Sequence, residues 1–213
     1  MTEPTRCSPL IPGAILASGW SQRMGRSKAL LPAGRGGQTF VRTLAATLQD
    51  GGVTDVLVIG RPDDASLRSE VATLGAGVRY VENHHAAQGQ ISSIVAAVNA
   101  VDHPGVQGLL VIPVDQPLIA AATVAALLLA FSRTRPPIAR ATHQGRHGHP
   151  VVFASALFGE LRRADPSQGA RVVVRAHAAE ALDVDVADPN VLIDIDDSDA
   201  YERVFGLPVP TGN

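Results

Sequence analysis

Near its amino-terminal end the chain reads Ala14-Ile15-Leu16-Ala17-Ser18-Gly19-Trp20-Ser21-Gln22-Arg23-Met24-Gly25-Arg26-Ser27-Lys28. The first four of these residues are apolar and predict a short buried strand. A loop of small and basic residues follows the strand directly. Because open α/β sheets bind ligands just beyond the carboxyl ends of their strands, we expect this loop to hold a ligand at the edge of a sheet.

The remainder of the first half alternates between short apolar runs and helical patterns. Apolar runs that predict strands cover residues 56–59 and 109–112, and a further strand is expected at 78–81. Helical patterns cover residues 40–48, 66–74 and 91–101. Continuous apolar runs are typical of strands that are buried on both faces. The alternation therefore predicts an α/β fold, a three-layer sandwich with a mostly parallel central sheet.

The second half predicts elements that extend this sheet. We expect strands at residues 138–142, 150–153, 181–186 and 191–195, the first two joined by a turn that contains glycine and histidine. We expect a buried helix at 119–131, a helix that ends at 161, and a last helix at 198–205 capped by Ser198. Residues 172–174 fit a helix or a strand equally well. With no repeat or linker visible, we expect a flexible leader at 1–12, one domain at 13–206 and a tail at 207–213.

Composition and charge exclude several classes of function. The chain has 213 residues, of which 46% are hydrophobic, and its 18 Lys+Arg and 20 Asp+Glu give a net charge of −2. This composition supports a core and lacks the basic excess of a nucleic-acid binder. The single cysteine excludes a disulfide framework, and the longest apolar run is too short for a membrane span. Since no signal peptide is visible, we expect a soluble cytoplasmic protein that binds neither nucleic acid nor membrane.

The loop after the first strand combines close backbone approach with positive charge. Ala17, Ser18 and Gly19 would let backbone amides approach an anion closely. Arg23, Arg26 and Lys28 place three positive charges within six positions, which suits a triphosphate better than a neutral ligand. The glycine spacing excludes both the Walker loop and the dinucleotide fingerprint. The alternative is a solvated turn with stray basic residues.

Carboxylates are available for a metal at the same edge of the sheet. Asp115 follows the strand expected at 109–112, and Mg²⁺ facing a polyphosphate needs only one or two protein carboxylates. A helix N-cap is the alternative role for Asp115. Near the carboxyl end, Asp194 and Asp196 alternate with apolar residues, so we expect both to project from one face of a strand. The acidic run around them also fits a solvated face.

Three histidines lie close together in the second half, at positions 143, 147 and 149. A transition-metal site and a polar turn are two interpretations, and no cysteine or acid joins the cluster. A third interpretation, which we favour, is that His149 lines the pocket of an acceptor substrate. There a partly positive imidazole would suit an anionic phosphate.

Residues 16–32 read Leu-Ala-Ser-Gly-x-Ser-x-Arg-Met-Gly-x-x-Lys-x-Leu-Leu-Pro, which resembles the signature loop of the molybdenum-cofactor nucleotidyltransferases. Further family-like blocks follow in order at residues 83–93, 114–117, 148–151, 168–171 and 193–196. Members of this family have a Rossmann-like, glycosyltransferase-A-like nucleotidyltransferase fold and transfer a nucleotide monophosphate from a nucleoside triphosphate to molybdopterin. The resemblance implies this fold and a Mg²⁺-dependent transfer.

Two branches of the family differ in two short motifs. Guanylyltransferases typically carry Ala-Gly-Gly in the loop and Asp-Met-Pro after the fourth strand, whereas cytidylyltransferases carry Ala-Ala-Gly and Asp-Gln-Pro. This chain has Ala17-Ser18-Gly19 and Asp115-Gln116-Pro117, so it is more similar to the cytidylyltransferases, and Ser18 departs from both branches.

The resemblance implies particular substrates and partners. CTP would be the donor and Mo-molybdopterin the acceptor, with a molybdoenzyme or its chaperone as a further partner. Three alternatives remain: GTP as donor, another small acceptor, or an NAD(P)H-dependent oxidoreductase on the same fold. Trp20 would either stack on an aromatic ligand or merely cover the site.

The resemblance also implies roles for individual residues. The catalytic residues would be Arg23, Lys28 and Asp115. The nucleotide would be bound by Leu16, Ala17, Ser18, Gly19, Arg23, Lys28, Asn83, Gly89 and Ser92. The metal would be held by Asp115 and Asp196, with Asp194 a less favoured ligand, and the acceptor by His149 and Arg171. Because the attacking phosphate is already an anion, catalysis is expected from positioning and charge neutralisation rather than from a general base.

Overall fold

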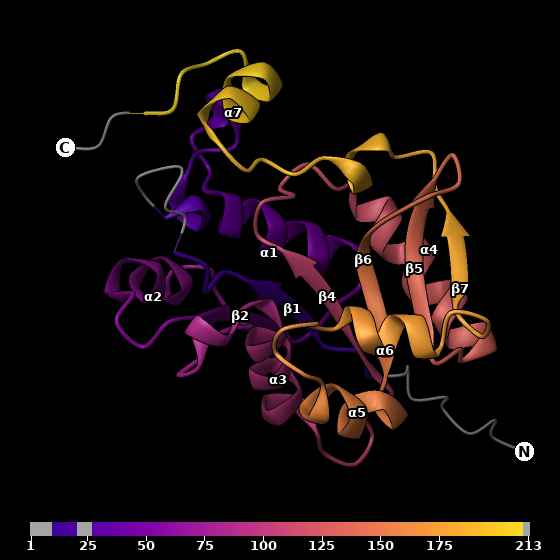
Figure 1. Ribbon diagram of the computed structural model, residues 1–213. Helices are drawn as coiled ribbons and strands as arrows, with labels where there is room; N and C mark the ends of the chain where they lie inside the picture. Colours follow the sequence, from indigo (N-terminus) through magenta and orange to yellow (C-terminus); the bar gives the residue numbers. More distant parts are fainter. Residues whose placement is uncertain (1–9, 21–26, 211–213) are drawn as a thin grey trace, which may run out of the picture.

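The structure is a computed structural model that describes residues 10–20 and 27–210. A seven-stranded sheet lies between two layers of helices (Figure 1). Its strands are β1 (Gly13–Leu16), β2 (Val56–Gly60), β3 (Val78–Glu82), β4 (Gly108–Pro113), β5 (Ile138–His143), β6 (Arg146–Ala154) and β7 (Leu182–Asp185). They are ordered β3-β2-β1-β4-β6-β5-β7, and β6 alone runs antiparallel to its neighbours. The predicted fold class, a mostly parallel α/β sandwich, is confirmed.

Each face of the sheet buries its own set of helices. One face packs against α1 (Phe40–Asp50), α2 (Ala65–Ala72), α4 (Ala121–Thr134) and α7 (Ser198–Phe205). The other face packs against α3 (Gln90–Val101), α5 (Phe158–Arg163) and α6 (Arg171–Ala176). Successive residues of β1 illustrate the division, because Ile15 faces the first layer whereas Ala14 and Leu16 face the second. No helix within the described residues combines the length and apolar character that a membrane span requires.

Several expected elements differ from those in the structure. Residues 191–195 were expected to form a strand, but the chain instead forms the short 3-10 helix η6 (Pro189–Leu192) and then continues irregularly. The side chain of Asp188 accepts a hydrogen bond from the Asn190 amide, and Pro189 presets the backbone for this turn. Asp194 and Asp196 therefore do not share one face of a strand.

Helix assignments need three smaller corrections. Residues 172–174 belong to α6. The cap of α7 is Asp197, whose carboxylate accepts a hydrogen bond from the Ala200 amide, and not Ser198. Helix α4 was expected to be buried, but only one of its faces is, since Leu129 is 53% exposed. The prediction of a buried helix rested on the apolar run alone, and an apolar run does not show which face of the helix packs against the sheet.

The sheet brings two loops to the same edge. Strands β1 and β4 are adjacent and parallel, with Leu16 opposite Pro113 at their carboxyl ends. The loop after β1 and the turn after β4 consequently begin side by side, joined by a hydrogen bond from the Val114 amide to the Leu16 carbonyl oxygen. This arrangement places the basic loop residue Lys28 and the acidic residue Asp115 within reach of each other.

Candidate functional site

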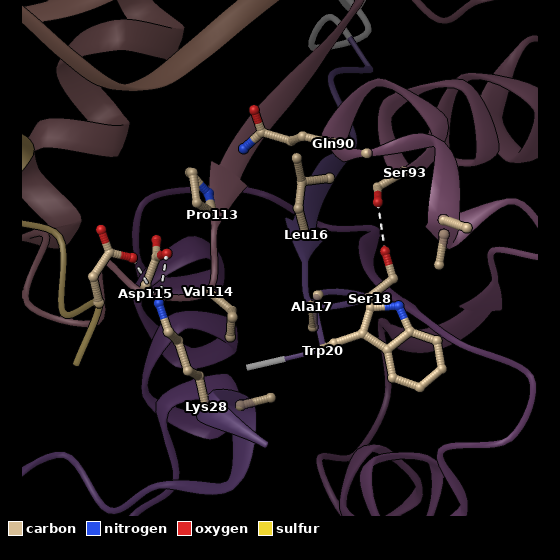
Figure 2. Close-up of a pocket in the computed structure, with 16 residues that line it drawn as sticks. Leu16, Ala17, Ser18, Trp20, Lys28, Gln90, Ser93, Pro113, Val114 and Asp115 are labelled. Carbon is tan, nitrogen blue, oxygen red and sulfur yellow. Dashed lines mark hydrogen bonds and ion pairs between the residues drawn. The ribbon is translucent and has the colours of Figure 1, made fainter. Parts of the chain in front are cut away.

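A cavity of about 680 Å³ opens at this edge of the sheet (Figure 2). Its walls come from the loop after β1, the turn after β4, the segment that leads into α3, and the segment before α7. The lining includes Leu16, Ala17, Ser18, Gly19, Lys28, Gly89, Asp115 and Asp196 from the predicted site. Eight residues that the family resemblance assigned to the site, over 180 positions of sequence, thus border one space.

Lys28 and two carboxylates form one side of the cavity. The Lys28 Nζ atom lies 2.7 Å from Asp196 Oδ1 and 3.3 Å from Asp115 Oδ2. The Lys28 side chain is only 11% exposed, and it enters from η2 (Lys28–Leu30). A hydrogen bond from the Ile195 amide to the Asp115 carbonyl oxygen, 2.8 Å long, fixes the segment that carries Asp196 against the turn after β4.

These carboxylates have the chemistry of a divalent-metal site. Two oxygen ligands from separate segments converge on one cation, the Lys28 ammonium group, which marks a position where positive charge is stabilised. Burial raises the pKa of Asp115, the nearby Lys28 ammonium opposes this shift, and the Asp194 and Asp196 carboxylates add to it. The residues present therefore fit a divalent cation.

The alternative role of Asp115 as a helix cap is excluded. Helix α4 begins at Ala121 and its N-cap is Ala120. The carboxylate at that helix end comes from Asp188, which accepts hydrogen bonds from the Ala120 amide and the Thr123 hydroxyl at 2.9 Å each. Asp115 is therefore not needed to cap α4, and its carboxylate faces the cavity.

The other side of the cavity is neutral and rich in hydroxyl groups. Ser18 and Ser93 share a hydrogen bond of 2.5 Å between their Oγ atoms. Behind them, the buried Asn83 amide group donates to Ser92 Oγ at 2.8 Å, to Ser93 Oγ at 3.2 Å and to Ser18 Oγ at 3.3 Å. Asn83 and Ser92 do not line the cavity themselves. They hold Ser18 and Ser93 in place.

Gly89 is needed for its backbone conformation. It has φ +83° and ψ −171°, a region that side-chain-bearing residues rarely adopt, and it directly precedes α3. Its carbonyl oxygen accepts a hydrogen bond from the Ser92 hydroxyl at 2.7 Å. Gly89 therefore shapes the entrance to α3 and places Gln90 and Ser93 on the cavity wall.

The two residues expected to bind the acceptor do not line this cavity. His149 is partly buried in β6, and burial lowers the pKa of its imidazole, opposed by the Asp194 carboxylate. This shift runs against the expected partly positive imidazole. Asp194 in turn accepts a hydrogen bond of 2.6 Å from the Gln116 amide group. Arg171 is exposed at the start of α6.

The other histidines bond separately to backbone and carboxylate groups. His143 Nδ1 lies 2.8 Å from the Val186 carbonyl oxygen, and His147 Nε2 lies 3.2 Å from Asp183 Oδ2. The residues that the structure describes contain no group of three or more metal-ligating side chains, so a transition-metal site is not found there. His147 and His149 lie within β6 rather than in the turn, which is made by Gln144 and Gly145.

Some residues that line the cavity were not predicted, and one predicted residue lies outside the part of the chain that the structure describes. Arg23 falls outside the described residues. Ala86, Ala87 and Gln90 line the cavity, but nothing in their residue types indicated this. A signal that could have singled out Lys28 is its rarity, because it is the only lysine in a chain with 18 Lys+Arg. Position 28 therefore carries a compact ammonium group, whereas every other Lys or Arg position of the chain carries a guanidinium group.

Comparisons with known proteins match one family and relatives whose names differ. Residues 13–181 match the family described as MobA-like NTP transferase domain. Nicotine blue oxidoreductase of Paenarthrobacter nicotinovorans is 29% identical over 212 residues, covering 92% of this chain and 97% of that protein. Molybdenum cofactor guanylyltransferase of Xanthomonas euvesicatoria pv. vesicatoria is 36% identical over 117 residues, covering 54% of this chain and 52% of that protein.

A solved structure extends the likeness to three dimensions. The crystal structure of Rv0371C from Mycobacterium tuberculosis H37Rv, in complex with manganese, superimposes with a TM-score of 0.71. It is 26% identical to this chain, and the match covers 92% of this chain and 98% of that one.

Proposed function

This chain belongs to the MobA-like NTP transferase family, and we propose that it transfers CMP from CTP to the terminal phosphate of Mo-molybdopterin. The products would be molybdopterin cytosine dinucleotide and pyrophosphate. The choice of CTP rests on Ala17-Ser18-Gly19 and Asp115-Gln116-Pro117, which are more similar to cytidylyltransferase motifs than to guanylyltransferase motifs. The choice of acceptor rests on the resemblance over residues 16–32, and the curated guanylyltransferase relative supports it.

The observation that carries this proposal is the position of Lys28 between Asp115 and Asp196 on the cavity wall. A nucleoside triphosphate brings several negative charges, and it needs cations to neutralise them. Lys28 supplies one positive charge at the cavity. The two carboxylates supply ligands for a second cation, which we propose is Mg²⁺.

In the proposed reaction, an oxygen of the acceptor's terminal phosphate attacks the α-phosphorus of CTP. A new phosphorus–oxygen bond forms there, the bond from the α-phosphorus to the oxygen bridging to the β-phosphate breaks, and pyrophosphate leaves. The attacking oxygen carries no proton that must be removed. Lys28 would bind the phosphates, so that they are held in line for the attack.

Asp115 and Asp196 would hold the divalent cation. When bound, that ion would neutralise charge on the reacting phosphates and on the leaving group. The manganese complex of the mycobacterial relative supports a divalent-metal site in this family. Burial raises the pKa of Asp115, and Asp115 must be deprotonated to hold the cation.

A pyrophosphate-release assay tests the proposal. Each of the four nucleoside triphosphates is supplied with and without Mg²⁺, and with and without Mo-molybdopterin. We expect release that requires both molybdopterin and Mg²⁺ and is fastest with CTP. Lys28→Ala should lower turnover by about 100-fold or more, the range for loss of one group that stabilises transition-state charge. Arg133→Ala, an exposed cation on α4, is the matched control and should retain full activity.

Three outcomes of the pyrophosphate-release assay would contradict parts of the proposal. Faster pyrophosphate release with GTP than with CTP would mean that GTP is the donor, and the proposed nucleotidyl transfer would stand. Full turnover in the Lys28→Ala variant would contradict the role of the cavity. No release with any triphosphate in the presence of molybdopterin would contradict the acceptor.

A second candidate function is favoured by one observation. The relative from Paenarthrobacter nicotinovorans, matched over 97% of its length, is named an oxidoreductase. A hydride transfer from NAD(P)H to a flat aromatic acceptor would use the same cavity and would not need Mg²⁺. Oxidation of NAD(P)H that continues in the presence of a chelator would favour this second function. The pairing of Asp115 and Asp196 around one cation favours the first.

A further inference from the structure

Trp20 is an exposed aromatic side chain at the cavity. It is 58% exposed, it belongs to the lining, and it is the only tryptophan in the chain. Trp20 and Leu129 are the large apolar side chains that stand out from the surface in the described part of the chain. Leu129 lies on α4 and does not line the cavity. Exposure of an indole beside a ligand cavity calls for an explanation that exposure of Leu129 does not.

Arg61 covers one face of the Trp20 ring. The guanidinium carbon lies 4.1 Å from the ring centroid, within the range of a cation–π contact. Arg61 itself is held by Asp63 at 3.1 Å and by the Gly19 carbonyl oxygen at 3.3 Å, and its side chain is only 17% exposed. Arg61 therefore restrains the indole, because it contacts one face of the ring and also donates a hydrogen bond to the Gly19 carbonyl oxygen, next to Trp20 in the chain. Within the described part of the chain, Trp20 nevertheless stays 58% exposed.

Trp20 lies away from the charged side of the cavity. In Figure 2, Trp20 and Ser18 stand on one side of Leu16 and Ala17, and Lys28 and Asp115 stand on the other. Apart from Lys28, Asp115 and Asp196, the residues that line the cavity are uncharged, among them Ser18, Gly19, Ala86, Ala87, Gly89 and Ser93. The cavity is thus divided into a part suited to phosphates and a part suited to an uncharged, flat group.

We propose that Trp20 is a stacking platform for the base of the bound nucleoside triphosphate, held in position by Arg61. The inference rests on the proposed function, because a nucleotide is the ligand whose charged and flat parts match the two parts of the cavity. The phosphates lie at Lys28, and the base lies on the face of the indole opposite Arg61. Trp20 is here a binding residue, and it has no part in the transfer of the CMP group.

Stacking has a recognisable energetic consequence. An aromatic platform contributes affinity for a base, and it is tolerant of base identity because every base has a π-face. Its removal should weaken nucleotide binding by about 5- to 100-fold. Removal should leave unchanged the binding of a ligand that has the phosphates without the base. Inorganic tripolyphosphate is such a ligand.

The single tryptophan makes the test direct. Intrinsic fluorescence of the wild-type chain is titrated with Mg²⁺-CTP and with Mg²⁺-tripolyphosphate, and both dissociation constants are measured by calorimetry. Calorimetry is repeated with Trp20→Ala, Trp20→Phe, Arg61→Ala and Leu129→Ala. Because Trp20 and Leu129 are similarly exposed, their alanine variants should fold equally well, which circular dichroism and thermal unfolding check.

The expected result has four parts. CTP quenches the fluorescence and tripolyphosphate does not. Trp20→Ala weakens CTP binding by about 5- to 100-fold and leaves tripolyphosphate binding unchanged. Trp20→Phe retains most of the affinity, because a ring remains. Arg61→Ala gives a smaller loss than Trp20→Ala, since the indole is present but less well oriented.

Failure of this inference is distinguishable from failure of the proposed function. If CTP binds the wild-type chain and Trp20→Ala binds it equally well, the stacking role is overturned and the nucleotide site stands. If Trp20→Ala weakens tripolyphosphate as much as CTP, the indole acts on the loop rather than on the base, and the inference is again overturned. If neither CTP nor tripolyphosphate binds the wild-type chain, the nucleotide site itself is overturned.

Discussion

Lys28 Nζ lies 2.7 Å from Asp196 Oδ1, although 168 positions of sequence separate the two residues. The same nitrogen lies 3.3 Å from Asp115 Oδ2. One ammonium group therefore ties together the loop after β1, the turn after β4 and the segment before α7. Without it, two carboxylates would face each other across a partly buried space, which is unfavourable for like charges.

The first prediction follows from this arrangement. Lys28→Met should lower the free energy of unfolding by about 1 kcal/mol in the absence of metal, a modest value because Asp196 is partly exposed to solvent. Mg²⁺ alone should then raise the melting temperature of Lys28→Met more than that of the wild-type chain. In the variant, Mg²⁺ no longer competes with the Lys28 ammonium group for the two carboxylates. Thermal unfolding with and without Mg²⁺ measures both effects.

Arg133→Met, on the exposed side of α4, is the control for loss of a positive charge as such, and its response to Mg²⁺ should equal that of the wild-type chain. An equal Mg²⁺ response in Lys28→Met and wild-type chains would show that the two carboxylates do not form the cation site.

The second prediction concerns Gly148 in β6. A Cβ atom at this position would lie 2.1 Å from the Val191 carbonyl oxygen, and backbone cannot yield as a flexible side chain can. Val191 belongs to η6, which leads to Asp196. Gly148→Ala should therefore cost about 1–3 kcal/mol of stability and lower activity by displacing Asp196. Urea unfolding and the pyrophosphate-release assay measure these two effects.

Gly36→Ala is the matched control, because a Cβ atom there meets nothing within 4 Å. Equal stabilities of Gly148→Ala and Gly36→Ala would mean that η6 can move aside freely, and that the packing of β6 against it does not position Asp196.

Much of the fold is readable from local sequence. The strands with continuous apolar runs, such as β2 and β4, are buried on both faces, and burial on both faces is what such a run indicates. Residues 191–195 gave a false strand, since the alternation of apolar and acidic residues there has the period of a strand. The preceding Asp188 and Pro189 instead impose a turn, and that local chemistry prevails over the alternation.

From the sequence, only those site residues that belong to family motifs could be predicted. The motifs named Lys28, Asp115 and Asp196, and the structure brings these three into contact. Periodicity could not have paired Lys28 with Asp196, because the contact depends on how distant segments cross the end of the sheet. Arg61 was missed for the same reason, since its contact with Trp20 joins the ends of β1 and β2 and has no local signature.

The third prediction is a pH dependence of stability due to His149. Burial lowers the pKa of His149 in the folded chain, whereas in the unfolded chain the pKa is about 6.5. Below that pH the unfolded chain binds a proton that folded His149 does not. Stability should therefore fall as the pH drops through about 6.5, by at most about 1.4 kcal/mol per pH unit, until the folded pKa is reached. Urea unfolding at about pH 7.5 and about pH 5.5 measures the loss.

His149→Gln should remove this part of the loss, because glutamine does not titrate. His103→Gln, at an exposed position, should leave the loss intact. The same pH dependence in His149→Gln and wild-type chains would contradict the prediction.

The last prediction concerns Ser18, which departs from both branches of the family. Its hydroxyl is engaged with Ser93 Oγ at 2.5 Å and accepts from Asn83 Nδ2 at 3.3 Å, so it is bonded to its own chain. Ser18→Ala should therefore raise KM for CTP and GTP alike, by roughly 5-fold for the loss of one hydrogen bond, and leave the ratio of their kcat/KM values unchanged. Ser93→Ala should act similarly, and the double variant should be little worse than either single variant because both remove the same bond. A tenfold change in the donor ratio for Ser18→Ala alone would instead mean that the hydroxyl reads the base.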